Sequence, residues 1–557
     1  MQKGGLHAEE RGRVRRSTLP GRFHIDRVGR LFVFVVVAVV SCFGCTAVGP
    51  NFAKPPAPVA ERWVEEGGAA TGAPQADYSR WWTAFNDPVL DSLIETARKQ
   101  SPTLQMAGLR ILEARAQLGI AVGNLYPQQQ QVAGAYTYSQ SSKHAANTIS
   151  GDLNFQTYSY AFDAAWELDF WGKFRRIVES ADASLTGSVA DYDNALVSLI
   201  GAVGSTYTLV RVYEERLVVA RENAAIQKSS FQLADARFRN GAVTELDMQQ
   251  AKSLLYDTEA QIPALEIGLK QSQHALSILL GMPPGDLKDL LGGSQGIPVP
   301  PVSVAVGIPA ELIARRPDIR SAELLAAAQC AQIGVAKADL FPRIAISGSF
   351  GFLSSDSPLT RKGKSNFSDL FTWQSFTMSS GPSIEWPVLN YGRIRNNIRV
   401  QDARFQEALM NYRSTVLSAA REVEDALVSF VKSRDQVRLL TESVGAAKRA
   451  VDLSMIQYRE GSIDYSRMLT AQQALLGEQD RLTQSRGAVT SGLVALYKAL
   501  GGGWQPRLES DFVSEENINA MRSRTNWGDL LPYRELSTNL VPLPAAGAQD
   551  LLRRPDW

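Results

Sequence analysis

Few residues of this chain have the types and spacing that chemistry needs. Its three cysteines are Cys42, Cys45 and Cys330, and its four histidines are scattered, with none at metal-ligand spacing. The sequence contains no G-x-S-x-G motif, no H-E-x-x-H motif and no phosphate-binding loop. We therefore predict no catalytic residue, no metal site and no cofactor.

Cys45 is the one cysteine that lies in a motif. Arg27 and Arg30 precede the apolar run 31–40, which is too short to span a bilayer and is typical of an export signal. Gly44-Cys45 then matches the small-residue-then-cysteine ending of a bacterial lipoprotein signal, although Cys42 stands where such a motif usually has leucine. The sequence predicts a signal peptide over 1–44 and acylation of Cys45. The alternative is a plain signal cleaved near Gly44, with an unmodified cysteine.

The net charge and the apolar pattern of the chain argue against two classes of protein, those that bind nucleic acid and those with transmembrane helices. The chain has 557 residues and a formal net charge of +1, so nucleic acid is not expected as a partner. Hydrophobic residues make up 45% and charged residues 21%, as is ordinary for an ordered protein. After residue 45 no apolar run reaches the ~18 residues of a membrane helix. A transmembrane helix is therefore not predicted.

Most of the sequence consists of two copies of one unit. Segment 238–251 recurs at 458–471 with the shared pattern aromatic-Arg-x-Gly, segment 166–176 recurs at 386–396, and segment 101–127 recurs at 316–342. A repeat of this length predicts two similar structural units. The expected organisation is a signal peptide at 1–44, a lipidated N-terminal segment at 45–89, repeat 1 at 90–281, a linker at 282–304, repeat 2 at 305–501, and an equatorial or partly disordered tail at 502–557.

Each repeat is expected to contain one very long helix. Apolar residues recur every three or four positions, and no proline falls between 172 and 262 or between 388 and 505. A helix of ~65 residues is about 100 Å long, which indicates a coiled-coil-like rod. The predicted helices are a first one at about 102–125, long ones at about 173–239 and 393–459, and returning ones at 243–280 and 463–500.

Between the first helix and the long helix of each repeat, the pattern changes to strands. We expect strands at about 129–140, 153–167, 343–353 and 373–386, because large apolar residues alternate there with small polar ones. The large residues of one face include Tyr158, Tyr160, Phe162, Ile344, Ile346 and Phe350.

Two interpretations of these strands remain open. They fit a membrane β-barrel whose large residues face lipid, or an antiparallel sheet packed on soluble protein. Because four strands cannot close a barrel, a membrane barrel would need strands pooled between subunits. A dimer would give eight strands and a filled interior, whereas a trimer would give twelve and room for a lumen.

Five segments in a fixed order carry a family resemblance. They are CTAVGPNFAKP at 45–55, WWTAFNDPVLDSLIETARKQSP at 81–102, PAELIARRPDIRSAELLAAAQ at 309–329, YREGSIDY at 458–465 and ALYKALGGGW at 495–504. Together with the repeat, they resemble the TolC-type outer-membrane efflux channels, in particular their lipoprotein branch.

The resemblance implies an α+β membrane protein that forms a homotrimer. A 12-stranded β-barrel, with four strands from each chain, would sit in the outer membrane of a Gram-negative bacterium. It would be continuous with a long α-helical coiled-coil barrel in the periplasm. Such a channel is a passive exit duct for drugs or other small molecules. Its implied partners are outer-membrane lipid, a periplasmic adaptor (membrane fusion protein) and an inner-membrane efflux pump of RND type; the resemblance implies no enzyme activity.

The resemblance also implies roles for the two helix–helix turns. Gly241, Ala242, Gly461 and Ser462 would form the periplasmic tips that contact the adaptor. The family often has acidic residues six or nine positions after the second tip glycine, where this chain has Arg467 and Thr470. Asp247 is the repeat partner of Arg467, so the two would alternate around a trimer and attract one another. The implied channel entrance comprises Asp247, Asp464, Arg467 and Thr470; the alternative is that these side chains only point into solvent.

Two other functional classes explain less of the sequence. A periplasmic lipid-anchored coiled-coil scaffold or adaptor without a pore would explain the helices but not the four aromatic strands. A lipid-anchored enzyme would need a nucleophile, a general base or a metal cluster, and the sequence offers none of these.

Overall fold

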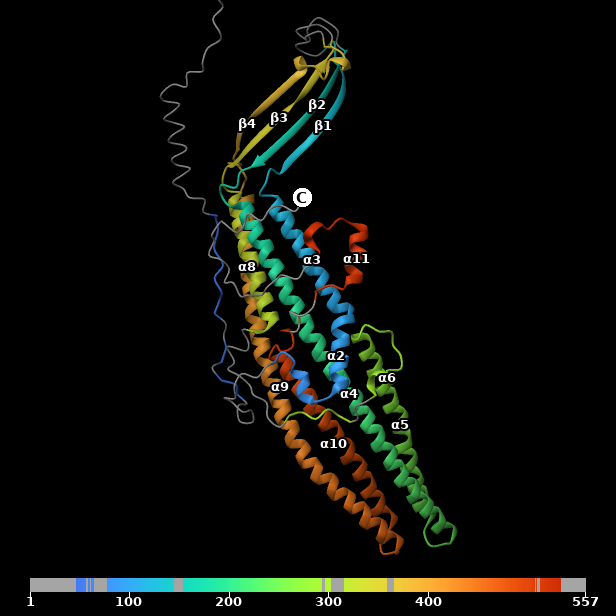
Figure 1. Cartoon of the computed structure of the whole chain (residues 1–557). Coiled ribbons are helices and arrows are strands. Elements are labelled where there is room, and N and C mark those ends of the chain that lie inside the picture. The colour runs from blue at the N-terminus through green and yellow to red at the C-terminus, as the bar shows by residue number, and fades with distance from the viewer. Residues whose placement is uncertain are drawn as a thin grey trace, which may run out of the picture. The chain divides into compact units, whose positions relative to one another are not determined.

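The computed structural model describes most of the chain beyond its first 46 residues (Figure 1). The described residues are 47–56, 59–60, 62–64, 78–144, 154–292, 296–301, 315–357, 365–505, 507 and 511–531. The predicted signal peptide and the predicted acylation site Cys45 lie outside these ranges, as do parts of the linker and the last 26 residues.

Two helices of 67 residues dominate the fold, α4 (Lys173–Arg239) and α9 (Arg393–Arg459). At 1.5 Å per residue each is about 100 Å long. Their returning partners α5 (Glu245–Leu279) and α10 (Tyr465–Ala499) have 35 residues each. These cover only part of α4 and α9, and the remainder is covered by α3 (Pro102–Gly123) and α8 (Pro317–Ala338).

Glycines set the ends of these helices in the same way in both repeats. Gly241 and Gly461 have φ angles of 70° and 76°, in the left-handed region that favours glycine. At the first turn the Gly241 amide donates to the Phe238 carbonyl and the Ala242 amide donates to the Arg237 carbonyl, both at 2.9 Å. This is the Schellman pattern that closes a helix, and the second turn repeats it.

The four strands form one antiparallel sheet in the order β1-β2-β3-β4 (Figure 1). They are β1 (Gln129–Gln140), β2 (Asn154–Glu167), β3 (Arg343–Ser355) and β4 (Phe376–Glu385). The central pair joins the two repeats, because β2 of the first pairs directly with β3 of the second. β1 and β4 form the two edges, each without a partner on its outer side among the described residues.

The expected strand at 373–386 is wrong at its start. Residues Trp373–Ser375 form a 3-10 turn, η4, and the strand begins only at Phe376. The cause is local hydrogen bonding, because the Ser375 amide donates to the Thr372 carbonyl and the Ser375 hydroxyl donates to the Asp369 carbonyl. These bonds curl the chain before it can enter the sheet.

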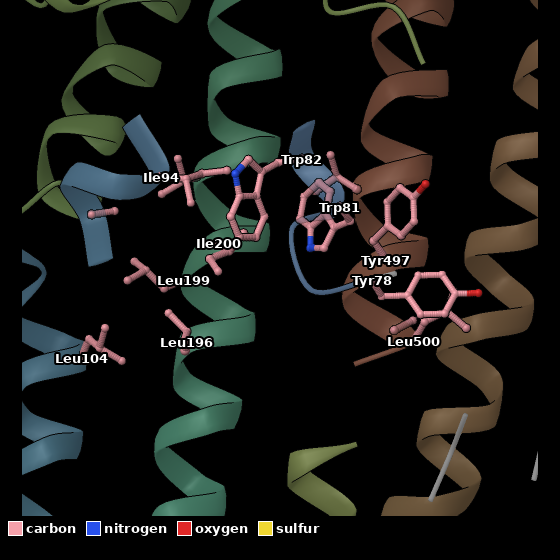
Figure 2. Packing of buried hydrophobic residues seen from close by; sticks show 14 of the residues in the cluster. Tyr78, Trp81, Trp82, Ile94, Leu104, Leu196, Leu199, Ile200, Tyr497 and Leu500 are labelled. Atoms are coloured by element: carbon pink, nitrogen blue, oxygen red, sulfur yellow. The ribbon is translucent and has the colours of Figure 1, made fainter. Parts of the chain in front are cut away.

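The main apolar core lies where the N-terminal segment crosses the long helices. The turn η2 (Trp81–Phe85) and helix α2 (Pro88–Gln100) pack on α4 and α10. Trp81 stacks on Tyr497 of α10 with ring centroids 5.2 Å apart (Figure 2). Asp87 caps α2 and accepts a 2.7 Å hydrogen bond from the buried Tyr207 hydroxyl of α4. The short helix α6 (Lys288–Leu291) closes this region.

The described part of the C-terminal tail packs on α3. Helix α11 (Glu515–Arg524) and the turn η6 (Gly528–Leu530) follow a segment that presses on Gly108, where an added Cβ would meet the Phe512 carbonyl oxygen at 2.0 Å. Earlier in the tail, the Arg507 guanidinium forms an ion pair with Asp193 of α4.

Among the helices that the structure describes, α4 has a stretch apolar enough to cross a membrane by composition. An 18-residue window of α4 has a mean hydropathy of 1.5, although the sequence alone led us to predict no such run. Of that window, 67% is buried inside the protein, where α4 packs against α3, α5, α8 and α10. This stretch is therefore the core of the helical part.

Candidate functional site

The sheet presents one aromatic face. Directly paired residues of an antiparallel sheet lie on the same face, and the register pairs Phe162 with Phe350 and with Val132. The Phe162 and Phe350 rings lie 5.1 Å apart. The six large residues singled out in the sequence all lie on this face: Tyr158, Tyr160, Phe162, Ile344, Ile346 and Phe350.

This face stays open to the surroundings in the single chain. Phe350 is 50% exposed, and Ile346, Tyr160 and Met378 are exposed beside it. A row of exposed aromatic and aliphatic side chains on a strand face is what a lipid-facing barrel wall requires.

The opposite face of the sheet is lined by small and polar side chains. Across its centre Asp163 pairs with Gln131 on one side and with Ser349 on the other. The remaining positions of this face include Ala133, Ala135, Ser159, Ala161, Ser347, Gly351, Ser379 and Gly381. Small side chains leave space in front of the sheet, as the wall of a water-filled duct would.

The two predicted tip turns contact one another within the chain. Tyr458 of α9 and Tyr465 and Met468 of α10 form a buried cluster with Ala234 of α4 and Ala251 of α5. The turn residues Gly241, Ala242, Gly461 and Ser462 remain exposed at the end of this cluster. The surface predicted for adaptor contact is therefore accessible.

A cationic contact that sequence reasoning missed holds the tips together. The Arg237 guanidinium lies over the Tyr458 ring, 4.8 Å from its centroid, and donates to the Tyr458 carbonyl oxygen. Burial raises the pKa of Tyr458 and of Tyr465, so both phenols are neutral at physiological pH. The turn sequences FRNGA at 238–242 and YREGS at 458–462 gave no sign that the two turns would meet.

The structure gives Asp247 a local role that the sequence analysis did not consider. The Thr244 amide and hydroxyl donate to Asp247 Oδ2 at 3.2 and 3.1 Å, which completes a capping box at the start of α5. Arg467 occupies the equivalent third position of α10 and is exposed. Asp464 precedes that helix as its N-cap, and the Thr470 hydroxyl donates to the Ser466 carbonyl.

The interface between α4 and α10 changes character toward the tips. Near the main core it is apolar, but further down Arg216 pairs with Asp480 at 2.6 Å and Asn223 donates to Gln479 at 2.7 Å. Closer to the tips Gln472 donates to the Ser230 hydroxyl. Between the main core and the buried cluster at the turns, the two hairpins are thus joined by polar contacts, which depend on precise geometry more than apolar packing does.

Comparison with known proteins gives this arrangement a family. A family model described as "Outer membrane efflux protein" matches residues 93–282 and 308–502. The pyoverdine export outer membrane protein OpmQ of Pseudomonas putida is 33% identical over 430 residues, which cover 76% of this chain and 88% of that protein. The probable outer membrane lipoprotein SilC of Salmonella typhimurium is 28% identical over 465 residues, covering 83% of this chain and 96% of that protein.

A solved structure agrees with the sequence relatives. The outer-membrane channel OprN has a TM-score of 0.75 and 31% identity to this chain, and the match covers 82% of this chain and all of OprN. The matched ranges of the family model contain both long helices and all four strands. The resemblance found in the sequence is confirmed, and the chain belongs to the outer membrane efflux protein family.

Proposed function

We propose that three copies of this chain form a twelve-stranded barrel in the outer membrane, continuous with a periplasmic helical barrel, through which small molecules leave the cell. Members of the family are outer-membrane channel components of efflux systems, which transport and do not catalyse. The observation that supports a trimeric barrel is the open four-stranded sheet. Its two edges, which have no partner strand within the described part of the chain, and its exposed aromatic face require partners, and four strands are too few to close alone.

Exposed stripes on two helices support self-association. On α5 the apolar residues Tyr256, Ile267 and Ile278 recur at every eleventh position and are more than half exposed. On α9 Leu417, Val428 and Leu439 recur at the same spacing. An eleven-residue period keeps a stripe on one side of a helix, so each stripe fits a neighbouring helix along its length. Pairing α5 of one subunit with α9 of the next would bury both stripes and close a ring.

We propose that the channel works with two partner proteins, a periplasmic adaptor and an inner-membrane pump. The exposed turns at Gly241 and Gly461 lie at the end of the helices remote from the sheet and suit contact with a periplasmic adaptor. At Gly241 an added Cβ would meet no atom within 4 Å, so this turn is open for docking. The adaptor would connect the duct to an inner-membrane pump, for which an RND-type pump is our proposal.

The pore is tested by conductance. Purified protein reconstituted in planar bilayers should give discrete current steps, and its trimer should migrate differently on gels before and after boiling. A periplasmic scaffold without a pore, the alternative from the sequence, would give neither result. Monomeric, non-conducting protein would overturn the proposal.

The lipid anchor is tested separately from the pore. Replacing Cys45 with alanine should abolish incorporation of labelled palmitate, because alanine lacks the thiol to which the lipid of the predicted motif would be attached. The trimer should still assemble, since one lipid anchor contributes little beside an embedded barrel. The relative SilC, named as a lipoprotein, supports this assignment. Normal palmitate labelling of the Cys45→Ala protein would contradict it.

We also propose a ring of alternating charges at the channel entrance. Three Asp247 and three Arg467 side chains would alternate around the trimer. Each exposed pair would stabilise the closed state by ~0.2–1 kcal/mol, and together the pairs would shift the equilibrium between the closed and open states about tenfold. Arg467→Ala should therefore raise the conductance of the isolated channel. For the acid we choose Asp247→Asn, because an amide oxygen can still accept from Thr244 and preserve the helix cap.

A matched control separates the ring from a general loss of charge. Glu245 lies in the same first turn of α5 and is exposed. Glu245→Gln should leave the conductance unchanged, and the swap Asp247→Arg with Arg467→Asp should restore the closed state. If the two single variants conduct like the parent, the ring does not hold the entrance shut.

A further inference from the structure

The connection between β3 and β4 returns onto the aromatic face of the sheet. Its described part contains the 3-10 turn η3 (Phe367–Asp369) and then η4. The Phe367 ring packs on Tyr158 with centroids 5.4 Å apart, and the Phe371 ring lies 6.0 Å from Tyr160. Both tyrosines belong to the face that we assign to lipid. The segment therefore lies over the outer side of the sheet, away from the face lined by small residues.

Hydrogen bonds fix this segment in place. The Asn366 amide donates to Asp369 Oδ2 at 3.0 Å, and the Ser354 hydroxyl of β3 donates to the Asn366 carbonyl at 2.9 Å. The Thr372 hydroxyl donates to the Asp369 carbonyl at 2.7 Å. Leu370 is buried beneath the segment. The backbone is thus held against the sheet by its own polar contacts.

The same segment exposes three large aromatic rings. Phe367 is 59% exposed, Phe371 62% and Trp373 80%, although all three could pack inward in a soluble protein. Trp373 stacks on Phe376 with centroids 4.9 Å apart and ring planes 8° apart, so its exposed position is fixed. Polar residues Ser368, Asp369, Gln374 and Ser375 alternate with the rings. The segment is amphipathic over a few residues.

The segment lies at the end of the sheet that is remote from the helices. β3 runs away from the helices toward this segment, and β4 returns from it to α9, so it sits at the rim of the sheet remote from the helical part (Figure 1). In a membrane barrel this rim lies at the boundary between acyl chains and head groups, where aromatic side chains are enriched.

We propose that the rim segment Phe367–Phe376 is an interfacial anchor, whose rings insert among the upper acyl chains of the outer leaflet on the outside of the barrel. This inference rests on the proposed barrel. Its partner is lipid at the acyl–head-group boundary. The segment therefore does not cover the mouth of the duct, and it holds the barrel at a fixed height in the membrane.

The depth of the segment can be measured with a fluorescent label and brominated lipids. Cys330, a buried free thiol, is replaced by alanine, and a bimane label is attached to Trp373→Cys. The protein is reconstituted with lipids brominated either near the glycerol end or near the methyl end of the acyl chain. A second label at Phe371→Cys guards against failure of one variant to fold.

Two neighbouring positions of β3 serve as matched controls. Phe350 lies on the aromatic face in the middle of the strand, and Ser349 lies on the opposite face. A label at 350 should be quenched most by the deep bromines, and a label at 349 only by aqueous iodide. If 350 and 349 behave alike, the barrel assignment fails, and the anchor fails with it.

With the controls as expected, the label at 373 decides the inference. It should be quenched severalfold more by the shallow bromines than by the deep ones, and little by iodide. Quenching by iodide alone would place the segment in water and overturn the proposal. Protection from all three quenchers would mean that a neighbouring subunit covers the segment, which would also overturn it.

Discussion

Replacing Arg507 with alanine is expected to destabilise the docked tail by about 3–5 kcal/mol, the cost of removing one partner of a buried ion pair. Arg507 Nε lies 2.6 Å from Asp193 Oδ1, and each side chain is only 3% exposed. The guanidinium also lies near the rings of Trp504 and Phe512. Without it the Asp193 carboxylate would remain inside the protein without its ion-pair partner, opposed by the weaker electrostatic influence of Arg320.

The size of this effect should depend on pH. Burial raises the pKa of Asp193 to about 7, although Arg507 and Arg320 act to lower it. Because the folded-state pKa lies above the ordinary value near 4, the folded state binds the proton more tightly than the unfolded chain does. The penalty for a charged Asp193 is therefore absent at low pH and grows as pH rises from about 4 to above 7. Arg507→Ala removes the strongest opposing charge, so its destabilisation should be larger near pH 8 than near pH 5.

Thermal unfolding of the purified protein at several pH values measures this difference, and limited proteolysis reports release of the tail. The double variant Asp193→Asn with Arg507→Ala is the control, since it has no buried acid and should lose the added pH dependence. A destabilisation by Arg507→Ala that is the same at low and high pH would contradict the assigned origin.

Phe162→Arg is expected to impair trimer assembly severely. Phe162 lies near the middle of β2 on the aromatic face, and an arginine near the bilayer midplane costs about 2–4 kcal/mol at each site. A trimer would bear this cost three times. Ala161→Arg is the matched control, because Ala161 faces the other side of the sheet, across from Gly351, which has no side chain to crowd it.

Assembly is measured as the fraction of heat-modifiable trimer on gels and as protein recovered in the outer membrane. Ala161→Arg should retain most of the trimer while Phe162→Arg loses it. Equal losses would indicate an ordinary soluble sheet, the second interpretation of the strand pattern.

The long helices were the most predictable part of the fold. Proline-free stretches with regular apolar spacing, ended by Gly241 and Gly461, indicate the ranges that α4 and α9 occupy. The two faces of each strand were equally predictable, because successive side chains of a strand point to opposite faces of the sheet. The pairing register then shows which side chains of neighbouring strands share a face. The start of β4 was not, because hydrogen bonds from Ser375 and Thr372 to Asp369 outweigh the aromatic character of Trp373.

The candidate site was only partly predictable. Thr244 and Asp247 have the S/T-x-x-acid spacing of a capping box, so the capping role of Asp247 could have been predicted from the sequence. The contact between Arg237 and Tyr458 was not, since the partners lie in different repeats and meet only through tertiary packing. The pair of Asp193 with Arg507 is hidden for the same reason, and an arginine in a tail would ordinarily be solvated.

The pairing of β2 with β3 sets the order in which the chain can fold. The hydroxyls of Thr157 and Ser355 meet across this pair although they are 198 positions apart. At about 5–20 residues per second, β3 is synthesised some 10–40 seconds after β2. During that delay the first hairpin has an unpaired edge and an uncovered aromatic surface, both of which promote aggregation. A first half synthesised alone therefore carries an aggregation-prone hairpin until the second half supplies the partner strand.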